Sequence, residues 1–457
     1  MAKWGWGFAG GGFDFARDEV ACQGAEIWVG WMSQSILGAV KPSVKRTSGV
    51  ALWVLWLGAV GGMWAQAAPV AAHWVGSWAA SQQVPEPANA LPPEDLRDAT
   101  LRQIVHLSVG GDSLRVHLSN AFGTAPLRFT AVHVARPISS AGAAIDPATD
   151  RAVTFAGSGE VIVPAGAEYI SDPVAYPVAA LSDLAISFHV EAPPVQETGH
   201  PGSRATSYVV HGDQVAAADL AGAKKIDHWY QLAGVDVAVP GQGAAVVALG
   251  DSITDGHGAT TNGNDRWTDV LARRLQATPA MRTMGVLNQG IGGNHVLTDG
   301  LGPNALARCD RDVLAQTDVR DLILLEGVND LGGLTRQGEV SQAEHQALVE
   351  RILGAYEQIV ERAHAQGIWV IGATITPYTG SDYYHPGSTS EADRQAINRW
   401  IRTPGHFDAV VDFDQVMRDP THPERLLPDY DSGDHLHPSP AGYRAMAEAI
   451  SLSLLRP

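Results

Sequence analysis

Hydrophobic and polar residues alternate along much of the first half of the chain. Leu114, Val116 and Leu118 alternate with polar or charged residues, and the same pattern runs through residues 184–191. A period of two is typical of β-strands that bury one face. Turn-forming residues separate these runs, and no long stretch there has the spacing of an amphipathic helix. We therefore predict an all-β domain of the sandwich or jelly-roll type over residues 68–240.

After residue 240 the pattern changes to short, continuous apolar runs. These runs lie at residues 246–249, 284–287, 322–325, 368–371 and 409–413. Residues 344–366 place apolar side chains three and four positions apart, as on one face of a helix. Buried strands that alternate with helices are typical of a parallel sheet with helices on both faces. We expect an α/β domain over residues 241–457.

The beginning of the chain has a pattern of its own. From Met32 a segment with basic residues precedes an uncharged apolar run at 49–64, and Ala65-Gln66-Ala67 follows. This order is typical of a secretory signal. We expect residues 1–67 to be an upstream extension plus a signal peptide, with the true start at Met32 and a secreted or periplasmic product. An uncleaved anchor is the alternative, but glycines dilute the run, so we expect cleavage and no stable membrane insertion.

The composition narrows the classes of partner. The 457 residues include 49 acidic and 31 basic side chains, which gives a net charge of −18. Phosphate binding needs clustered lysine and arginine, so we expect no nucleic-acid partner. Two cysteines are too few for a disulfide scaffold or a cysteine zinc cluster.

Candidate chemistry lies just after the predicted parallel strands, where such folds bind their ligands. Ser252 follows the first strand on a glycine turn and is placed like a nucleophile. A serine nucleophile needs a base and a group that orients the base, and His437 and Asp434 could supply both. The amide of Ser252, the amide of Gly293 and the side chain of Asn329 are candidate donors for an oxyanion hole.

These segments resemble the motif blocks of the SGNH (GDSL-type) hydrolases. The matching blocks are Gly250-Asp251-Ser252, Gly293 in its glycine loop, Gly327-Val328-Asn329-Asp330 and Asp434-His435-Leu436-His437-Pro438. The resemblance covers residues 244–455, with Ile253 where the family's motif has leucine. It implies a flavodoxin-like three-layer fold and ester hydrolysis through an acyl-enzyme on Ser252, with His437 as base and no cofactor. The preceding β domain is similar to those of secreted bacterial members.

Each motif also has a structural explanation when taken alone. An Asp-x-x-His sequence can cap a helix, and the glycines at 290–293 lack the third glycine of a dinucleotide loop because His295 stands there. His422, His435 and His437 lie close in sequence, as in a metal site. Without a His-Glu-x-x-His helix or paired cysteines we expect solvated loop histidines and no metal.

Other residues near the motifs have expected supporting roles. We expect Asp251 and Asp255 to hold the turn at the nucleophile, and Asp412 and Asp414 to fix the loop that leads to Asp434. Four aromatic residues could line an acyl or sugar pocket, and we expect at least half of them to be packing residues: Trp267, Tyr378, Tyr383 and Tyr384.

The sequence thus predicts an exported serine ester hydrolase for short acyl groups. The motif loops are short and include no long apolar lid, which disfavours long-chain lipids. Export and the β domain make O-acetyl groups on carbohydrates an attractive substrate. Two alternatives remain open: an acyltransferase that uses the same residues, and a glycan-binding protein whose α/β domain is not catalytic.

Overall fold

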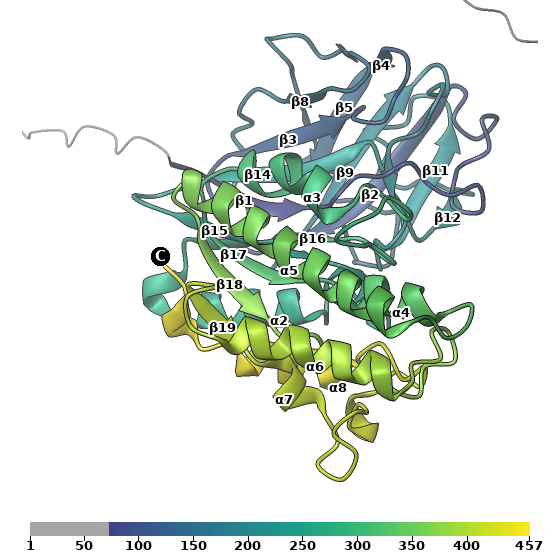
Figure 1. Ribbon diagram of the computed structural model, residues 1–457. Helices are drawn as coiled ribbons and strands as arrows, with labels where there is room; N and C mark the ends of the chain where they lie inside the picture. The colour runs from purple at the N-terminus through teal and green to yellow at the C-terminus, as the bar shows by residue number, and fades with distance from the viewer. Residues whose placement is uncertain (1–72) are drawn as a thin grey trace, which may run out of the picture. The chain divides into compact units, whose positions relative to one another are not determined.

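The computed structural model describes residues 73–457, which belong to one compact unit (Figure 1). The predicted extension and signal peptide at residues 1–67 lie outside the described residues. The described chain has a β region at residues 73–239 and an α/β region at residues 244–457.

The β region contains strands only, apart from one short helical turn, η1 (Pro147–Thr149). Its strands are β1 (His73–Ala79), β2 (Ala99–His106), β3 (Leu114–Ser119), β4 (Leu127–Phe129), β5 (Ala131–Ala135), β6 (Arg151–Ala152), β7 (Val161–Val163), β8 (Glu168–Ile170), β9 (Asp183–Val190), β10 (Gly199–His200), β11 (Ser207–His211), β12 (Lys224–Ile226), β13 (Trp229–Tyr230) and β14 (Leu232–Val239).

Two antiparallel sheets make up most of the β region. Their strand orders are β1-β14-β3-β8 and β12-β11-β2-β9-β5-β6, and side chains of both sheets join one hydrophobic core. The predicted alternation is confirmed in β3, where Leu114, Val116 and Leu118 are buried. In β9 both faces are buried, because a second hydrophobic cluster with Ala185 covers the face predicted to be exposed. The jelly-roll topology stays a prediction.

The α/β region alternates strands with helices, as the apolar runs predict. Its strands are β15 (Ala244–Gly250), β16 (Met284–Gly290), β17 (Val319–Leu325), β18 (Trp369–Ala373) and β19 (Ala409–Val411). Its helices are α1 (Ser252–Asp255), α2 (Trp267–Ala277), α3 (Ala305–Cys309), α4 (Val328–Thr335), α5 (Gln342–Ala365), α6 (Ser388–Arg402), α7 (Phe413–Met417) and α8 (Pro440–Ala449). Short helical turns are η2 (Pro279–Met281), η3 (Asp310–Leu314), η4 (Pro428–Tyr430) and η5 (Leu452–Leu454).

The sheet of the α/β region is wholly parallel, with the strand order β16-β15-β17-β18-β19. This is the 2-1-3-4-5 order of flavodoxin-like folds, in which the order of the strands across the sheet reverses between the first and third strands. Helices α5 and α6 pack against each other, as do α2 and α8 (Figure 1). Helix α5 begins at a capping box formed by Ser341 and Glu344, close to the predicted start. Ligands of such sheets bind at the carboxyl ends of the strands next to the reversal, here β15 and β17.

The two regions pack tightly against each other. Strand β1 contacts β16, and the N–H of Val286 in β16 donates a hydrogen bond of 2.9 Å to Ser108 Oγ of the β region. The architecture changes between Val239 and Ala244, within the link where the sequence predicts a domain boundary. The hydrophobic core nevertheless continues across that link, so the regions form a single packed body. Among residues 73–457, no helix has both the length and the apolar character that crossing a bilayer requires.

Candidate active site

Ser252 stands at the tight turn between β15 and α1. Strand β15 ends at Gly250, and Asp251 caps α1 by accepting a hydrogen bond of 2.9 Å from the N–H of Ile253. Asp251 therefore holds the turn, as predicted from the sequence. This turn places Ser252 at the carboxyl edge of the parallel sheet, at the first residue of the helix.

Ser252, His437 and Asp434 form a continuous series of hydrogen bonds. Ser252 Oγ lies 2.8 Å from His437 Nε2, and His437 Nδ1 lies 2.6 Å from Asp434 Oδ2. The other carboxylate oxygen, Asp434 Oδ1, accepts the backbone N–H groups of Leu436 and His437 at 3.0 and 2.8 Å. The short loop thus fixes both the carboxylate and the ring. An imidazole held in this way can accept the proton of a serine hydroxyl.

The environment of Asp434 favours its ionised form. Burial would raise the pKa of this carboxyl, but the hydrogen bond and positive charge of His437 outweigh burial, with help from the two backbone N–H groups. The net effect holds the pKa of Asp434 well below its usual range. A carboxylate that stays charged can stabilise an imidazolium beside it throughout the neutral pH range.

The three predicted oxyanion donors lie in the same cleft as this series. Within residues 73–457, the N–H groups of Ser252 and Gly293 donate to no other group, and Gly293 has a φ of 72° that favours glycine. Asn329 lies in the first turn of α4. Its Oδ1 accepts the hydroxyl of Tyr384 at 2.6 Å, while its Nδ2 donates to the carbonyl of Asn294 at 2.6 Å. One N–H of the Asn329 amide remains for a ligand.

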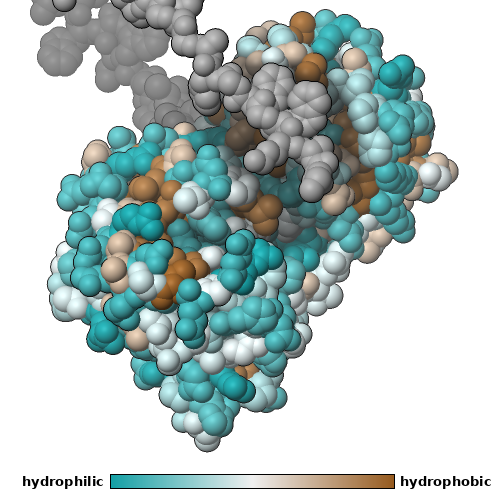
Figure 2. All heavy atoms as spheres, turned by 45° about the vertical axis from the view of Figure 1, so that its right-hand side comes forward, coloured by the Kyte–Doolittle hydropathy of each residue, from teal (hydrophilic) through white to brown (hydrophobic). Residues whose placement is uncertain are grey.

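The cleft has a volume of about 1140 Å³, and both regions of the chain contribute to its walls. Figure 2, which brings the right-hand side of Figure 1 forward, shows the surface hollowed on this side of the molecule. Most lining side chains are polar or charged, and the only aliphatic ones in the described cleft apart from proline are Leu301 and Leu436. The β region supplies Gln83, Glu86 and Asn89, whose side chains hydrogen bond to one another at 2.8 Å.

The four candidate pocket aromatics divide into two that line the cleft and two that lie in the core. Tyr383, with 52% of its surface exposed, and Tyr384 line the cleft. Trp267 and Tyr378 are fully buried in the core. Half of the predicted pocket aromatics are therefore packing residues.

Two predicted supporting roles differ from the observed contacts. Asp255 does not merely hold its own turn, because its carboxylate bonds to His200 of the β region. Asp412 and Asp414 do not reach toward the loop of the cleft: both accept hydrogen bonds from Arg402 of α6, and the side chain of Asp412 caps α7. These two carboxylates lie directly after β19, and there they hold helices α6 and α7 in place.

One group among the described residues has potential metal-ligand atoms within 4.8 Å of one another: His257, Asp434 and His437. Both ring nitrogens of His437 are already bonded within the series, so the geometry favours proton transfer over metal binding. His422 lies outside this group, near Glu424. No motif in the sequence points to His257. His257 follows the first motif by only a few residues, and its place against His437 depends on how two distant loops meet.

Three buried carboxyl groups lie in or near the turn that carries Ser252: Asp251, Glu326 and Asp330. Burial raises the pKa of Asp251 to about 7, against the opposing hydrogen bond from Ile253. Burial and the nearby charge of Asp251 raise the pKa of Glu326 well above its usual range, and burial also raises that of Asp330. The guanidinium of Arg308 is the cation that contacts this group, 3.2 Å from Glu326.

The variant Asp251→Asn is expected to become more stable, relative to the natural chain, as the pH rises from 5 to 8. A carboxyl whose pKa is higher in the folded state contributes stability at low pH and loses it as the pH rises through that pKa, here about 7. Asparagine does not ionise and can still cap α1. Urea unfolding at both pH values should show a relative gain on the order of 1–3 kcal/mol. The exposed control Asp429→Asn should show no such trend, and a parallel pH dependence of both variants would contradict the prediction.

Part of the chain matches a known protein family. Residues 248–445 match the model described as the GDSL-like Lipase/Acylhydrolase family. The comparison with curated proteins finds no match. Among solved structures, the chain is similar to a protein from Desulfitobacterium hafniense DCB-2 described as lipolytic and of the G-D-S-L family, at 25% identity over 45% of this chain and 97% of that chain, with a TM-score of 0.34.

Two further solved structures are similar over the same share of the chain. They are the acetyl xylan esterase AlAXEase, at 19% identity over 45% of this chain and 96% of that chain with a TM-score of 0.34, and the M. smegmatis aryl esterase, at 17% identity over 45% and 95% with a TM-score of 0.33. At such TM-scores the likeness carries no conclusion about what this chain acts on.

Proposed function

Residues 248–445 belong to the GDSL-like lipase/acylhydrolase family, and from this premise we propose that the protein is a serine esterase that hydrolyses short-acyl carboxylic esters. One observation carries the proposal: Ser252 Oγ, His437 and Asp434 are joined by hydrogen bonds of 2.8 and 2.6 Å at the wall of an open cleft. A serine, a base and an orienting carboxylate in this order are the parts that acyl transfer through an acyl-enzyme needs.

In the proposed reaction, Ser252 Oγ attacks the ester carbonyl while His437 Nε2 takes the hydroxyl proton. The N–H groups of Ser252 and Gly293 and the Asn329 amide donate to the oxyanion. Collapse of the tetrahedral intermediate breaks the ester C–O bond, and His437 gives its proton to the leaving alcohol. Water then attacks the acyl-enzyme with the same base, which releases the acid and restores Ser252. Asp434 stays ionised and stabilises the imidazolium at each step.

The lining of the cleft favours a hydrophilic alcohol and a small acyl group. A long acyl chain needs a continuous apolar wall, whereas the described cleft offers little aliphatic surface beyond Leu301 and Leu436. Hydroxyl-rich alcohols can hydrogen bond with the polar wall that includes Glu86 and Asn89. We therefore include O-acetyl groups on carbohydrates in the proposal. Export is part of it too, supported by the signal-like pattern within residues 32–67.

The test is turnover of p-nitrophenyl acetate, butyrate and octanoate, together with acetate release from acetylated glucose. We expect kcat/KM to fall from acetate to octanoate, because only the short acyl group avoids placing apolar surface against polar walls. A preference for octanoate would contradict the short-acyl proposal. Absence of turnover on every ester would contradict esterase activity itself.

Adding alcohol acceptors to the same reactions separates hydrolysis from transfer. A hydrolase releases mainly free acid, whereas an acyltransferase forms mainly a new ester with the acceptor. The cleft between the two regions is open to solvent, which supports hydrolysis, since transfer requires that water be kept from the acyl-enzyme. Predominant ester formation would replace the hydrolase in the proposal by a transferase.

A further inference from the structure

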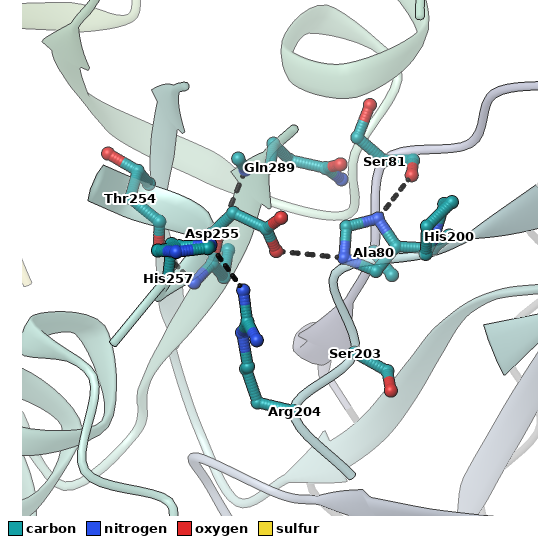
Figure 3. A network of polar contacts seen from close by, with 12 residues as sticks. Ala80, Ser81, His200, Ser203, Arg204, Thr254, Asp255, His257 and Gln289 are labelled. Carbon is teal, nitrogen blue, oxygen red and sulfur yellow. Dashed lines mark hydrogen bonds and ion pairs between the residues drawn. The ribbon is translucent and has the colours of Figure 1, made fainter. Parts of the chain in front are cut away.

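A loop of the β region reaches the end of the nucleophile helix. This loop begins at His200, the last residue of β10. His200 Nε2 lies 2.9 Å from Asp255 Oδ1, at the last residue of α1, and His200 Nδ1 lies 2.8 Å from the carbonyl of Ser81 (Figure 3). Both side chains of the pair are 4% exposed. Gly202 completes the contact, because a Cβ at this position would lie 1.8 Å from the Asp255 carboxylate. The loop is thus fixed against α1.

Arg204 extends from the same loop into the cleft wall. One guanidinium nitrogen, Nη2, lies 2.9 Å from Nδ1 of His257, and Figure 3 shows the two side chains pointing toward each other. The backbone of Arg204 has a φ of 48°, and its carbonyl accepts the N–H of Asn262 at 2.8 Å, so its position is tied to the loop after α1. A guanidinium only donates hydrogen bonds. Nδ1 of His257 must therefore accept, which places the single ring proton on Nε2.

His257 in turn lies against the proposed base. The ring centroids of His257 and His437 are 4.0 Å apart, and Nε2 of His257 is 3.9 Å from Asp434 Oδ2. The backbone of His257 is held at both ends, since its N–H donates to the carbonyl of Ser252 and its own carbonyl accepts the hydroxyl of Tyr443. A second proton could bind His257 only at Nδ1, the atom into which Arg204 already donates.

We propose that Arg204 is a positioning residue, which keeps His257 uncharged so that the Asp434 carboxylate serves His437 alone. The inference rests on the proposed esterase function. If His257 were protonated, its charge would compete with His437 for Asp434 and would repel the imidazolium that forms when Ser252 loses its proton. The loop of the β region thereby takes part in setting the pH range of the reaction.

The charged groups around His257 support this assignment. Four charged or titratable groups act on the His257 ring. They are Asp434 and His437 in the loop of residues 431–438, Arg204 in the β region and Asp255 in α1. Burial, and then the positive charges of His437 and Arg204, lower the pKa of His257 to about 4, while the two carboxylates oppose this shift. Loss of Arg204 removes one of the lowering charges and frees Nδ1, so protonation of His257 moves to higher pH.

The first test follows the histidine rings by NMR in protein labelled at histidine, and it needs no substrate. The variant His257→Gln identifies the His257 signal by its loss. In the natural chain we expect a neutral ring with the proton on Nε2 down to pH 5, and in Arg204→Met a titration shifted upward by about one pH unit. An unchanged titration in Arg204→Met, or a proton on Nδ1 in the natural chain, would overturn the proposal even if the protein proved not to be an esterase.

The second test compares kcat/KM for p-nitrophenyl acetate between pH 5 and pH 8. Arg204→Met should lose about twofold more activity at pH 5 than at pH 8, mainly in kcat, because a titration shifted upward by about one unit leaves half of the His257 rings protonated at pH 5. Arg204→Lys should recover part of that loss. In the double variant Arg204→Met/His257→Gln the extra loss at acid pH should disappear, because the titrating ring is gone. Arg336→Met, which removes another arginine of the cleft, should leave the pH dependence unshifted. Equal losses at both pH values, or an acid loss that persists in the double variant, would show that Arg204 acts only on folding or substrate binding.

Discussion

Ser252→Ala is expected to remove nearly all ester turnover, with kcat lower by about 10⁴-fold or more. The hydroxyl makes one side-chain hydrogen bond, to His437, so its loss takes away the nucleophile but few packing contacts. Turnover of p-nitrophenyl acetate measures the effect. Mass spectrometry of the natural enzyme, quenched during turnover, should find one added acetyl group on the peptide that contains Ser252, and the variant should carry none.

The matched control is Ser388→Ala, at an exposed serine that begins α6. This variant should keep its kcat, and both variants should unfold at temperatures close to that of the natural chain. Equal activity of Ser252→Ala and the natural chain would show that another group is the nucleophile. An acetyl group found on a different peptide would lead to the same conclusion.

Arg308→Met is expected to lower the free energy of unfolding by about 3–5 kcal/mol, because it leaves buried hydrogen-bond acceptors without their donor. None of the other variants should lose as much stability. The Arg308 side chain is fully buried, next to the turn that carries Ser252. Its guanidinium donates hydrogen bonds of 2.6–3.3 Å to the carbonyl oxygens of Gly250 and Gln289 and to the side chains of Ser81, Asn294, Asp312 and Glu326. Domains are commonly stable by only about 5–15 kcal/mol, so the variant should lose a large part of its stability.

Urea unfolding at pH 7 measures this loss. Arg351→Met is the control, since Arg351 lies on an exposed position of α5 and bonds only to a carbonyl of its own helix. Its effect should stay within about 0.5 kcal/mol. A loss below about 1 kcal/mol in Arg308→Met would mean that the acceptors find other partners and that Arg308 does not hold the strand ends together.

Local patterns in the sequence predict the elements of the α/β region well. Each of the five apolar runs contains a strand of the parallel sheet, because a strand buried on both faces is mostly apolar. The fifth run extends past its strand, since β19 ends at Val411 and Phe413 begins α7. The strand order does not follow from those runs, and only the resemblance to a family implies it. The family match at residues 248–445 confirms that resemblance. The pattern of β9 was misread because alternation along one strand carries no information about what covers its second face.

The candidate site divides in the same way. Ser252, Asp434 and His437 were identified because each lies in a short motif next to a strand end or a helix start, and the fold brings them together. His200, Arg204 and Arg308 carry no such signal. Arg204 meets His257 across 53 positions of sequence, and Arg308 meets Ser81 across 227. Contacts of this kind depend on how the two regions pack, and a single sequence does not record that packing.

The contact between β1 and β16 limits how the two regions of this chain can be separated or recombined. Strand β16 is the edge of the parallel sheet, and the β region covers it, with Ser108 taking the N–H of Val286. Edges left uncovered pair readily with other chains. An α/β region that begins at residue 241 would therefore expose the unpaired edge strand β16, which favours aggregation. It would also lack the loop that carries Arg204. A chimera that joins another protein's β region to this sheet must therefore cover the edge strand β16 and also supply the loop that carries Arg204.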